Sequence, residues 1–214
     1  MKIAIIGAGS VGRALGGVWA VAGHDIHYGV RDPDEAKSIA AVGATPGSRA
    51  RHTAEAVAGA DVVVIATHWG QTKEALASAG DLTGKIVIDV TNPLRPDFSD
   101  LEEGYSVSGG ERVAEWAVGA RVYKAFNTTA AENMADAGRY ASRPVMFVAG
   151  DEPEGKRAVM ALVAAAGFEG VDAGPLISSR LLEPLAMLYI RVAFTTPLGR
   201  DYALAVLRPA AGSS

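Results

Sequence analysis

The chain has 214 residues, of which 49% are hydrophobic, and its formal net charge is −4. This length and composition predict one or two domains with a sizeable core, and the weak negative charge argues against binding to nucleic acid. The sequence contains no cysteine, which excludes disulfides, cysteine-ligated metals and thiol catalysis.

The ends and the hydropathy of the chain favour a cytoplasmic protein. The sequence begins directly in a predicted strand, so we expect no signal peptide. No uncharged apolar run reaches the roughly 18 residues that a membrane span needs. We therefore expect no membrane association, and no residue pattern here predicts a metal site.

The first 31 residues predict a strand, a glycine-rich turn, a helix and a second strand. The apolar residues 1–6 run into Gly7-Ala8-Gly9-Ser10-Val11-Gly12, and an apolar helical stripe follows as far as Gly23. In such a turn the first glycine permits the tight bend, the second admits a pyrophosphate, and the third lets the helix pack on the strand. The helix N-terminus offers free N–H groups to the phosphates. The pattern predicts a dinucleotide site; the alternative is a plain βαβ unit in which the glycines serve packing alone.

The end of the second strand indicates which dinucleotide is bound. Enzymes that use NAD usually carry Asp or Glu there, whereas this chain has Gly29-Val30-Arg31. A glycine would leave room for a 2′-phosphate, and the Arg31 guanidinium could bind it, so NADP(H) is favoured over NAD(H). We interpret Asp32 as the N-cap of a helix that begins at Pro33. The alternative for Arg31 is a solvated surface side chain.

The rest of the chain alternates strands and helices, which is typical of an α/β fold with a doubly wound, mostly parallel sheet. Further strands are predicted at residues 44–48, 61–66, 85–90, 122–125, 144–149 and 170–172. Helices are predicted at 33–41, 53–58, 71–79, 110–118, 151–166 and from 178 onward. The last stretch, 209–214, reads as a frayed terminus.

Polar residues follow three of the predicted strands, and the carboxyl ends of parallel strands meet at one edge of a sheet. Together with the glycine turn they give the expected NADP(H)-binding set: Gly7, Gly9, Ser10, Val11, Gly12, Arg31, Ala66, Thr67, His68, Trp69, Asn92, Pro93, Ala125 and Asn127.

Several members of this set have a second interpretation. Trp69 could shield the dinucleotide or pack under a loop, and His68 could be a general base or an ordinary loop residue. Asn92-Pro93 is also turn chemistry. Asn127 is the best candidate for contact with the nicotinamide, or it caps a helix over residues 130–134. We expect the neighbouring Lys124 to face solvent or a partner.

No acid–base pair stands out in the sequence. A Tyr-x-x-x-Lys pattern is missing, so the catalytic residues stay unknown, with Asn127 and His68 as weak candidates. Reactions that make or consume an alcohol usually need a placed proton donor, whereas hydride transfer between two ring cofactors needs mainly positioning.

Taken together, these residues resemble the coenzyme F420-dependent NADP oxidoreductase family, and the resemblance covers essentially the whole chain. It rests on Gly7-x-Gly9-x-x-Gly12, Gly23-His24, Gly29-x-Arg31, Asn92-Pro93-Leu94, Lys124-Ala125-Phe126-Asn127-Thr128, and Asp172-Ala173-Gly174-Pro175-Leu176 with Ser179-Arg180-Leu181.

The resemblance implies a Rossmann domain over residues 1–176, a small C-terminal helical region over 177–214, and a homodimer. It also implies a second ligand, a deazaflavin or a flavin, held between Asn127, Leu176 and Ser179. One departure concerns the turn, where the deazaflavin enzymes carry an extra glycine and this chain has Ile6-Gly7. Another is Asn127, which stands where those enzymes can carry His. The form with Asn at this position looks more like a broader branch of predicted dinucleotide-binding proteins, which includes the reductase domain of metal-reducing membrane proteins.

The leading hypothesis is an oxidoreductase that moves a hydride between NADP(H) and a deazaflavin (F420) or flavin. One alternative is an NADPH-dependent reductase of a small carbonyl or imine, with His68 or Tyr123 as the acid. Another is a non-catalytic protein that responds to NADP(H). The sequence leaves the acceptor, the physiological direction and the oligomeric state open.

Overall fold

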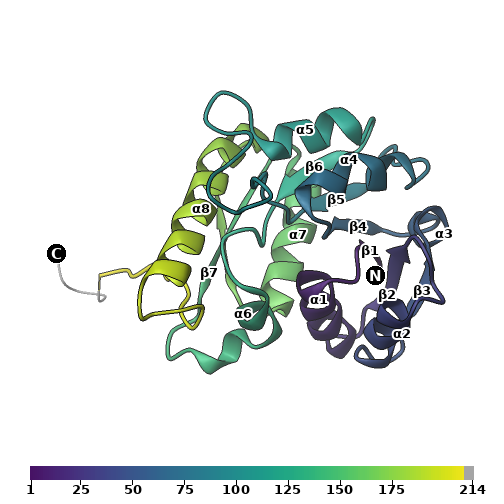
Figure 1. The fold of residues 1–214 in the computed structure, drawn as a ribbon, viewed down its shortest axis with the longest axis horizontal. Helices are drawn as coiled ribbons and strands as arrows, with labels where there is room; N and C mark the ends of the chain where they lie inside the picture. Colours follow the sequence, from purple (N-terminus) through teal and green to yellow (C-terminus); the bar gives the residue numbers. More distant parts are fainter. Residues whose placement is uncertain (210–214) are drawn as a thin grey trace.

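The computed structural model describes residues 1–209, which form a central sheet covered by helices on both faces (Figure 1). The eight strands lie in the order β3-β2-β1-β4-β5-β6-β7-β8, and all neighbours are parallel except β6 and β7. Their bounds are β1 Lys2–Ile6, β2 Asp25–Val30, β3 Arg49–His52, β4 Val62–Ile65, β5 Ile86–Asp89, β6 Arg121–Lys124, β7 Val145–Gly150 and β8 Glu169–Asp172.

The helices divide between the two faces because the side chains of the inner strands alternate. Ile3 and Ile5 of β1 pack with the buried residues of one face, and Ala4 and Ile6 with those of the other. The first face carries α1 Ser10–Val21, α2 Ala36–Gly43, α6 Ala131–Ala135 and α7 Pro153–Ala165. The second carries α3 Thr53–Val57, α4 Trp69–Ala77 and α5 Gly109–Trp116. The short helices η1 Ala137–Arg139 and η2 Leu176–Ser178 complete the list with α8 Ser179–Thr195.

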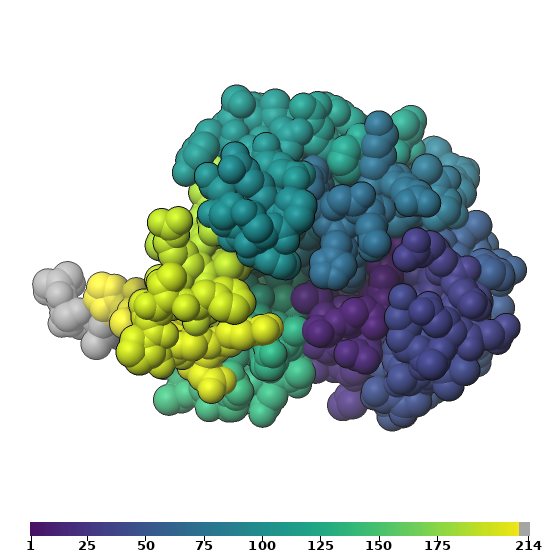
Figure 2. Space-filling view, viewed as in Figure 1, coloured from purple at the N-terminus to yellow at the C-terminus, as the bar shows by residue number. Residues whose placement is uncertain are grey.

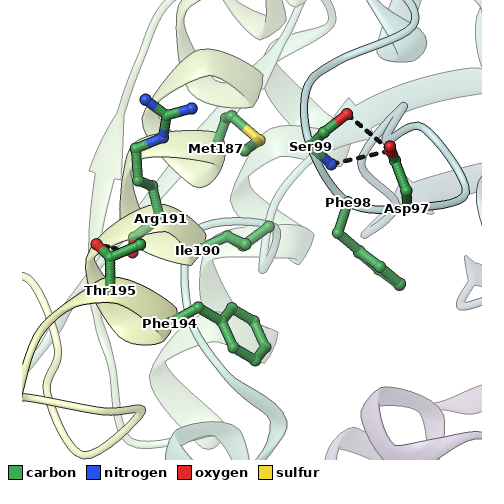
Figure 3. A pocket seen from close by; sticks show the side chains of 8 residues that line it. All are labelled: Asp97, Phe98, Ser99, Met187, Ile190, Arg191, Phe194 and Thr195. Atoms are coloured by element: carbon green, nitrogen blue, oxygen red, sulfur yellow. Dashed lines mark hydrogen bonds between the residues drawn. The ribbon is translucent and has the colours of Figure 1, made fainter.

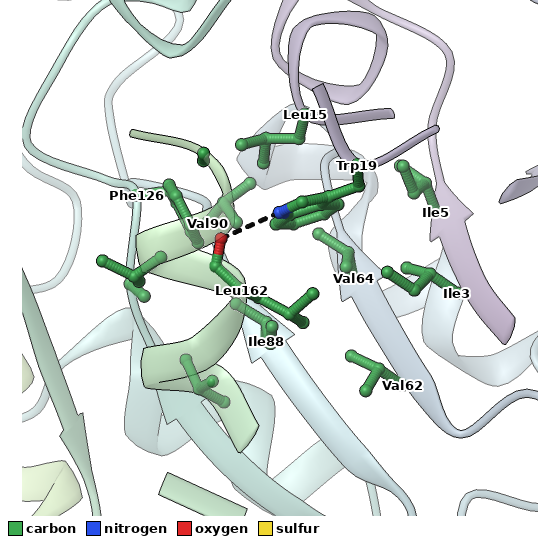
Figure 4. Packing of buried hydrophobic residues seen from close by; sticks show 14 of the residues in the cluster. Ile3, Ile5, Leu15, Trp19, Val62, Val64, Ile88, Val90, Phe126 and Leu162 are labelled. Atoms are coloured by element: carbon green, nitrogen blue, oxygen red, sulfur yellow. Dashed lines mark hydrogen bonds between the residues drawn. The ribbon is translucent and has the colours of Figure 1, made fainter. Parts of the chain in front are cut away.

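Trp19 of α1 anchors the larger core (Figure 4). Its indole Nε1 donates a buried hydrogen bond of 3.0 Å to the carbonyl of Leu162 in α7. Its ring meets Phe126 edge to face, with centroids 5.6 Å apart. Helices from opposite ends of the chain are thereby joined over the middle of the sheet.

The predicted fold class, a doubly wound and mostly parallel α/β sheet, is confirmed. The predicted strand at 44–48 is wrong, since the strand in that place is β3, Arg49–His52. The helix expected from Pro33 begins at Ala36 with Glu35 as its N-cap, and the Asp32 carboxylate accepts a bond from the N–H of Asp34 in a turn. The division at residue 176 stays a prediction, and most of the stretch expected to fray, residues 210–214, lies outside the described residues.

Over residues 1–209, none of the helices combines the length and apolar character needed to cross a membrane.

Candidate active site

The carboxyl ends of β1, β4, β5 and β6 lie side by side at one edge of the sheet, where the order of strands reverses between β1 and β4. In open parallel sheets this is where ligands bind. Figure 2 shows a hollow on the same face, between residues near the N-terminus in purple and α8 in yellow.

The glycine turn after β1 has no space for a side chain at two of its glycines and has space for one at the third. Gly7 has φ +109°, and a Cβ there would lie 2.5 Å from the carbonyl oxygen of Ala66. A Cβ on Gly12 would lie 2.2 Å from the carbonyl oxygen of Gly7. A Cβ on Gly9 would meet nothing within 4 Å. Gly7 and Gly12 therefore stand where the backbone leaves no space for a side chain, and Gly9 borders open space; its expected contact with a pyrophosphate stays a prediction.

The N-terminus of α1 is free to bind an anion. Gly9 is its N-cap and supplies no side-chain cap, and no acidic residue lies in the first turn. The N–H of Arg13 is bonded to the carbonyl of Gly9, while the exposed Ser10 begins the helix. The unbonded N–H groups and the positive end of the helix dipole suit phosphate oxygens.

Arg31 is exposed directly after β2, where a 2′-phosphate would lie. Two basic residues of β3 are its neighbours, because Arg51 is in register with Gly29 and His52 with Val30. The backbone carbonyl of Arg31 is 3.1 Å from Nδ1 of His52. Sequence reasoning missed Arg51 and His52, since the strand that carries them was placed too early.

Gly29 packs against the start of α3. It is buried, and a Cβ there would lie 3.3 Å from Cα of Thr53, the first residue of α3. Its missing side chain therefore makes room for α3, and its expected part in the choice between NADP(H) and NAD(H) stays a prediction.

Asn92 and Asn127 form a pair at the ends of β5 and β6. Nδ2 of Asn92 donates to the carbonyl of Asn127 over 2.9 Å, and Nδ2 of Asn127 donates to Oδ1 of Asn92 over 3.0 Å. Asn127 is not a helix cap, because α6 begins at Ala131 with Ala130 as its N-cap. Its Oδ1 is buried and has no partner among the described residues. An unpaired buried amide oxygen is costly, so this atom is suited to a donor on a ligand.

Phe126, the residue before Asn127, has the left-handed φ of +61° although it is not glycine. Such a backbone costs about 1–3 kcal/mol and persists only when the surroundings hold it. The ring is fully buried and meets Phe168 and Trp19 edge to face. The core thus stabilises the strained turn that leads into Asn127.

The predicted site residues that follow β4 differ in their exposure and in their contacts. The hydroxyl of Thr67 bonds to that of Thr72 over 2.9 Å, and Trp69 is half-buried against Trp116 with centroids 5.3 Å apart. His68 is exposed at the start of α4. Trp69 therefore packs under the neighbouring helix, and any contact with the dinucleotide stays a prediction.

Four predicted residues are buried around this edge. Pro93 and Ala125 are covered, and Leu176 belongs to the core on the second face. Ser179 is fully buried against Gly110, where a Cβ would lie 2.6 Å from its Oγ. Contact of Leu176 and Ser179 with a second ligand stays a prediction.

Two ionisable side chains of β6 are inside the protein. The expectation that Lys124 faces solvent or a partner is wrong, because its side chain is completely buried and bonded to Asp89. The Tyr123 hydroxyl donates to the carbonyl of Glu152 at the start of α7. Burial and the Glu152 carboxylate raise the pKa of Tyr123 to about 12, which makes it a poor proton donor. Within residues 1–209, no group of three or more His, Asp or Glu could hold a metal ion.

Known proteins similar to this chain agree with the geometry. The family profile "NADP oxidoreductase coenzyme F420-dependent" matches residues 2–93. An F420-dependent NADP reductase from Methanothermobacter thermautotrophicus is 30% identical over 213 residues, covering 90% of this chain and 89% of that protein. The metalloreductase STEAP3 of Rattus norvegicus is 29% identical, but its match spans only 37% of that protein.

A solved structure points to the same family of F420-dependent NADP reductases. The structure of an Arthrobacter sp. FB24 protein, provisionally assigned as an F420-dependent NADP reductase, has a TM-score of 0.87 at 31% identity. The match covers 97% of this chain and 100% of that one. An imine reductase from Aspergillus terreus, solved in complex with NADPH4 and dibenz[c,e]azepine, has a TM-score of 0.66 at 21% identity over 90% of this chain and 61% of that one, and so shares the fold alone.

The glycine turn, the basic residues after β2 and these relatives define an NADP-dependent oxidoreductase with a Rossmann-like fold. The chain belongs to the family of F420-dependent NADP oxidoreductases, as its sequence motifs predicted.

Proposed function

We propose that the protein transfers a hydride between NADP(H) and the ring of a deazaflavin such as F420 or of a flavin. The observation that carries the proposal is the glycine turn after β1, where a side chain would have space at Gly9 but would collide with backbone atoms at Gly7 and Gly12. This turn lies across a hollow from α8. It supports a dinucleotide on one side of the hollow and leaves the other side for an acceptor.

The residues present suit NADP(H). The N-terminus of α1 would hold the pyrophosphate, and Arg31 with Arg51 and His52 would hold the 2′-phosphate. Asn92 and Asn127 would hold the nicotinamide end, where Oδ1 of Asn127 can accept a bond from an amide. When bound, the cofactor would supply the hydride from its dihydronicotinamide ring.

The acceptor would lie in a groove of about 370 Å³ between the loop after β5 and α8. Phe98 of the loop and Phe194 of α8 extend into the same open space in Figure 3, beside Met187 and Ile190. Aromatic and apolar walls suit a flat ring. Arg191 and Asp97 are the charged residues that line this groove, and an anionic tail would leave on the side of Arg191. The adjoining groove, lined by Asp100, Glu102 and Glu103, would repel such a tail.

No proton donor is needed from the protein in this reaction. The acceptor ring would take up a hydride from NADPH and one proton from water. The ionisable group beside Asn127 is Lys124, whose ammonium is occupied by Asp89, Thr91 and Glu183. The rate would depend on how the protein aligns the two rings.

The test is to mix purified protein with NADPH and either F420 or FMN and to follow NADPH oxidation at 340 nm. We expect turnover with at least one acceptor, and faster turnover with NADPH than with NADH. No turnover with either acceptor would overturn the proposal, and NADPH binding without turnover would favour a binding protein. Turnover only with small cyclic imines or carbonyls would favour the alternative reductase.

The homodimer and the cytoplasmic location implied at the sequence level stay predictions. Light scattering on the purified protein would measure the first.

A further inference from the structure

The most buried cation of the described chain is Lys124, at the carboxyl end of β6. Its Nζ lies 2.8 Å from Oδ2 of Asp89, 2.7 Å from the carbonyl of Thr91 and 2.7 Å from Oε1 of Glu183. An ammonium has three protons, so each of them has an acceptor. The side chain thus joins β5, β6 and α8 at one point.

Glu183 holds a further element in place. Its Oε2 accepts the N–H of Gly109 over 2.8 Å, and its Oε1 accepts the N–H of Gly110 over 2.9 Å. These are the first two residues of α5, and a Cβ on Gly109 would lie only 3.1 Å from Oε1 of Glu183. The two glycines therefore let the start of α5 approach α8 closely enough for these bonds.

The positive and negative groups of this cluster stabilise one another. Burial disfavours the ammonium of Lys124, but the carboxylates of Asp89 and Glu183 outweigh it and raise its pKa above the ordinary value. Two carboxylates face one ammonium, and the backbone N–H groups at the positive end of α5 meet the remaining negative charge. The ammonium of Lys124 is therefore held by charged and backbone partners on every side.

The cluster connects directly to the predicted nicotinamide site. Oδ1 of Asp89 accepts the N–H and the hydroxyl of Thr91, which fixes the turn before Asn92. Asn127 bonds to Asn92, and its Nδ2 also donates to the carbonyl of Leu182 over 3.1 Å. The next residue is Glu183. One network of hydrogen bonds thus runs from the asparagine pair to α8.

The same helix forms the far wall of the hollow. Beyond Glu183, residues Met187, Ile190, Arg191 and Phe194 of α8 line the groove assigned above to the acceptor. A displacement of α8 relative to β5 and β6 would therefore change the separation between the two sites.

We propose that Lys124, acting with Glu183, is a positioning residue for hydride transfer that sets the distance between the asparagine pair and the acceptor wall of α8. This inference rests on the function proposed above. Because hydride transfer needs the reacting carbons nearly in contact, a shift of about 1 Å can slow it about 100-fold.

The test compares Glu183→Gln with Glu111→Gln. Both variants neutralise a carboxylate that links α5 to α8, but Glu111 does so through Arg180 at the surface. For Glu183→Gln we expect NADPH affinity within about twofold of wild type and single-turnover hydride transfer slowed about 10- to 100-fold. Glu111→Gln should transfer hydride at the wild-type rate.

Two further measurements separate positioning from damage to the fold. With NADPH deuterated at C4, the isotope effect should depend more steeply on temperature in Glu183→Gln than in wild type. If that variant does not fold, the triple variant Asp89→Asn/Lys124→Met/Glu183→Gln, which removes the three buried charges together and leaves none unpaired, replaces it.

Equal hydride-transfer rates in Glu183→Gln and wild type would overturn the inference. So would a parallel loss of NADPH affinity and rate, which would mark a purely structural role. If the wild-type protein itself reduces neither acceptor, the proposed function fails and the positioning role fails with it.

Discussion

At the residue scale, the glycine turn gives a matched pair of substitutions. Gly9→Ala places its methyl group in open space with an allowed backbone, so the free energy of unfolding should change by less than about 1 kcal/mol. The same methyl group would occupy the pyrophosphate's approach, and NADPH affinity should fall at least about tenfold.

Gly12→Ala is the control for that substitution. Its Cβ would meet the carbonyl oxygen of Gly7 at 2.2 Å, so the protein should lose about 1–3 kcal/mol of stability. Urea unfolding and NADPH titration measure both variants. Unchanged NADPH binding by Gly9→Ala would refute the site.

Arg31 carries the prediction on cofactor choice. Arg31→Ala should weaken NADPH by about 1.5–3 kcal/mol, roughly 10- to 150-fold, and leave NADH nearly unchanged. Arg49→Ala is the control, because Arg49 lies on β3 but pairs with Asp25 at the start of β2. Isothermal titration with both dinucleotides measures the difference. An equal loss for NADPH and NADH would refute the role in binding the 2′-phosphate.

Single residues also show where the sequence misleads. Lysine side chains are ordinarily exposed to solvent. The residues near Lys124 in the sequence do not indicate its ion pair with Glu183, which comes much later in the chain. The strained φ of Phe126 is equally invisible, because it depends on packing against Trp19 and Phe168. By contrast, Gly7 and Gly12 act through local backbone geometry, so the need for glycine at these two positions could be predicted.

At the element scale, α5 and α8 are joined at the surface as well as in the core. Arg180 donates to both carboxylate oxygens of Glu111, which also completes a capping box with Ser108. Hydrogen bonds from Arg180 and Ser108 lower the pKa of Glu111 to about 2 from its ordinary 4.5. The ionised form thus stabilises the fold fully above pH 4.5 and loses that contribution as the pH falls toward 2.

Glu111→Gln should therefore be less stable than wild type by about 1–2 kcal/mol at pH 7, with the difference shrinking between pH 4.5 and pH 2. Urea unfolding at a series of pH values measures this. Glu115→Gln is the control, because Glu115 pairs with Arg112 at the exposed surface. A difference that stays constant from pH 7 to pH 3 would contradict the assignment.

The edge strand β3 shows why one element was misplaced. Its sequence, Arg49-Ala50-Arg51-His52, lacks the apolar residues that mark the inner strands, since it lies at the edge of the sheet and its side chains are largely exposed. Residues 44–48, where a strand was predicted, contain the turn pair Pro46-Gly47 and form a turn. Because β3 places Arg51 and His52 beside Arg31, the error also hid two candidate ligands of the 2′-phosphate.

At the scale of the whole molecule, the doubly wound, mostly parallel sheet could be predicted from the sequence pattern, whereas the order of its strands and the antiparallel pairing of β6 with β7 were not predicted. The inner strands β1, β4 and β5 are continuous apolar runs because both sheet faces are covered. The opposing wall of the hollow could not be predicted in this way. It depends on how α8 and the loop after β5 pack together, and the grooves between them are formed by residues distant in sequence.

The Lys124–Glu183 contact also bears on the order in which a newly made chain acquires its structure. The ribosome releases the dinucleotide turn first, then β5 and β6, and α8 after all of them. Before α8 emerges, Glu183 is missing from the partners of the Lys124 ammonium and of the first two N–H groups of α5. The part of the protein that would recognise NADP(H) is therefore translated before the helix that would set the spacing between the two ligands.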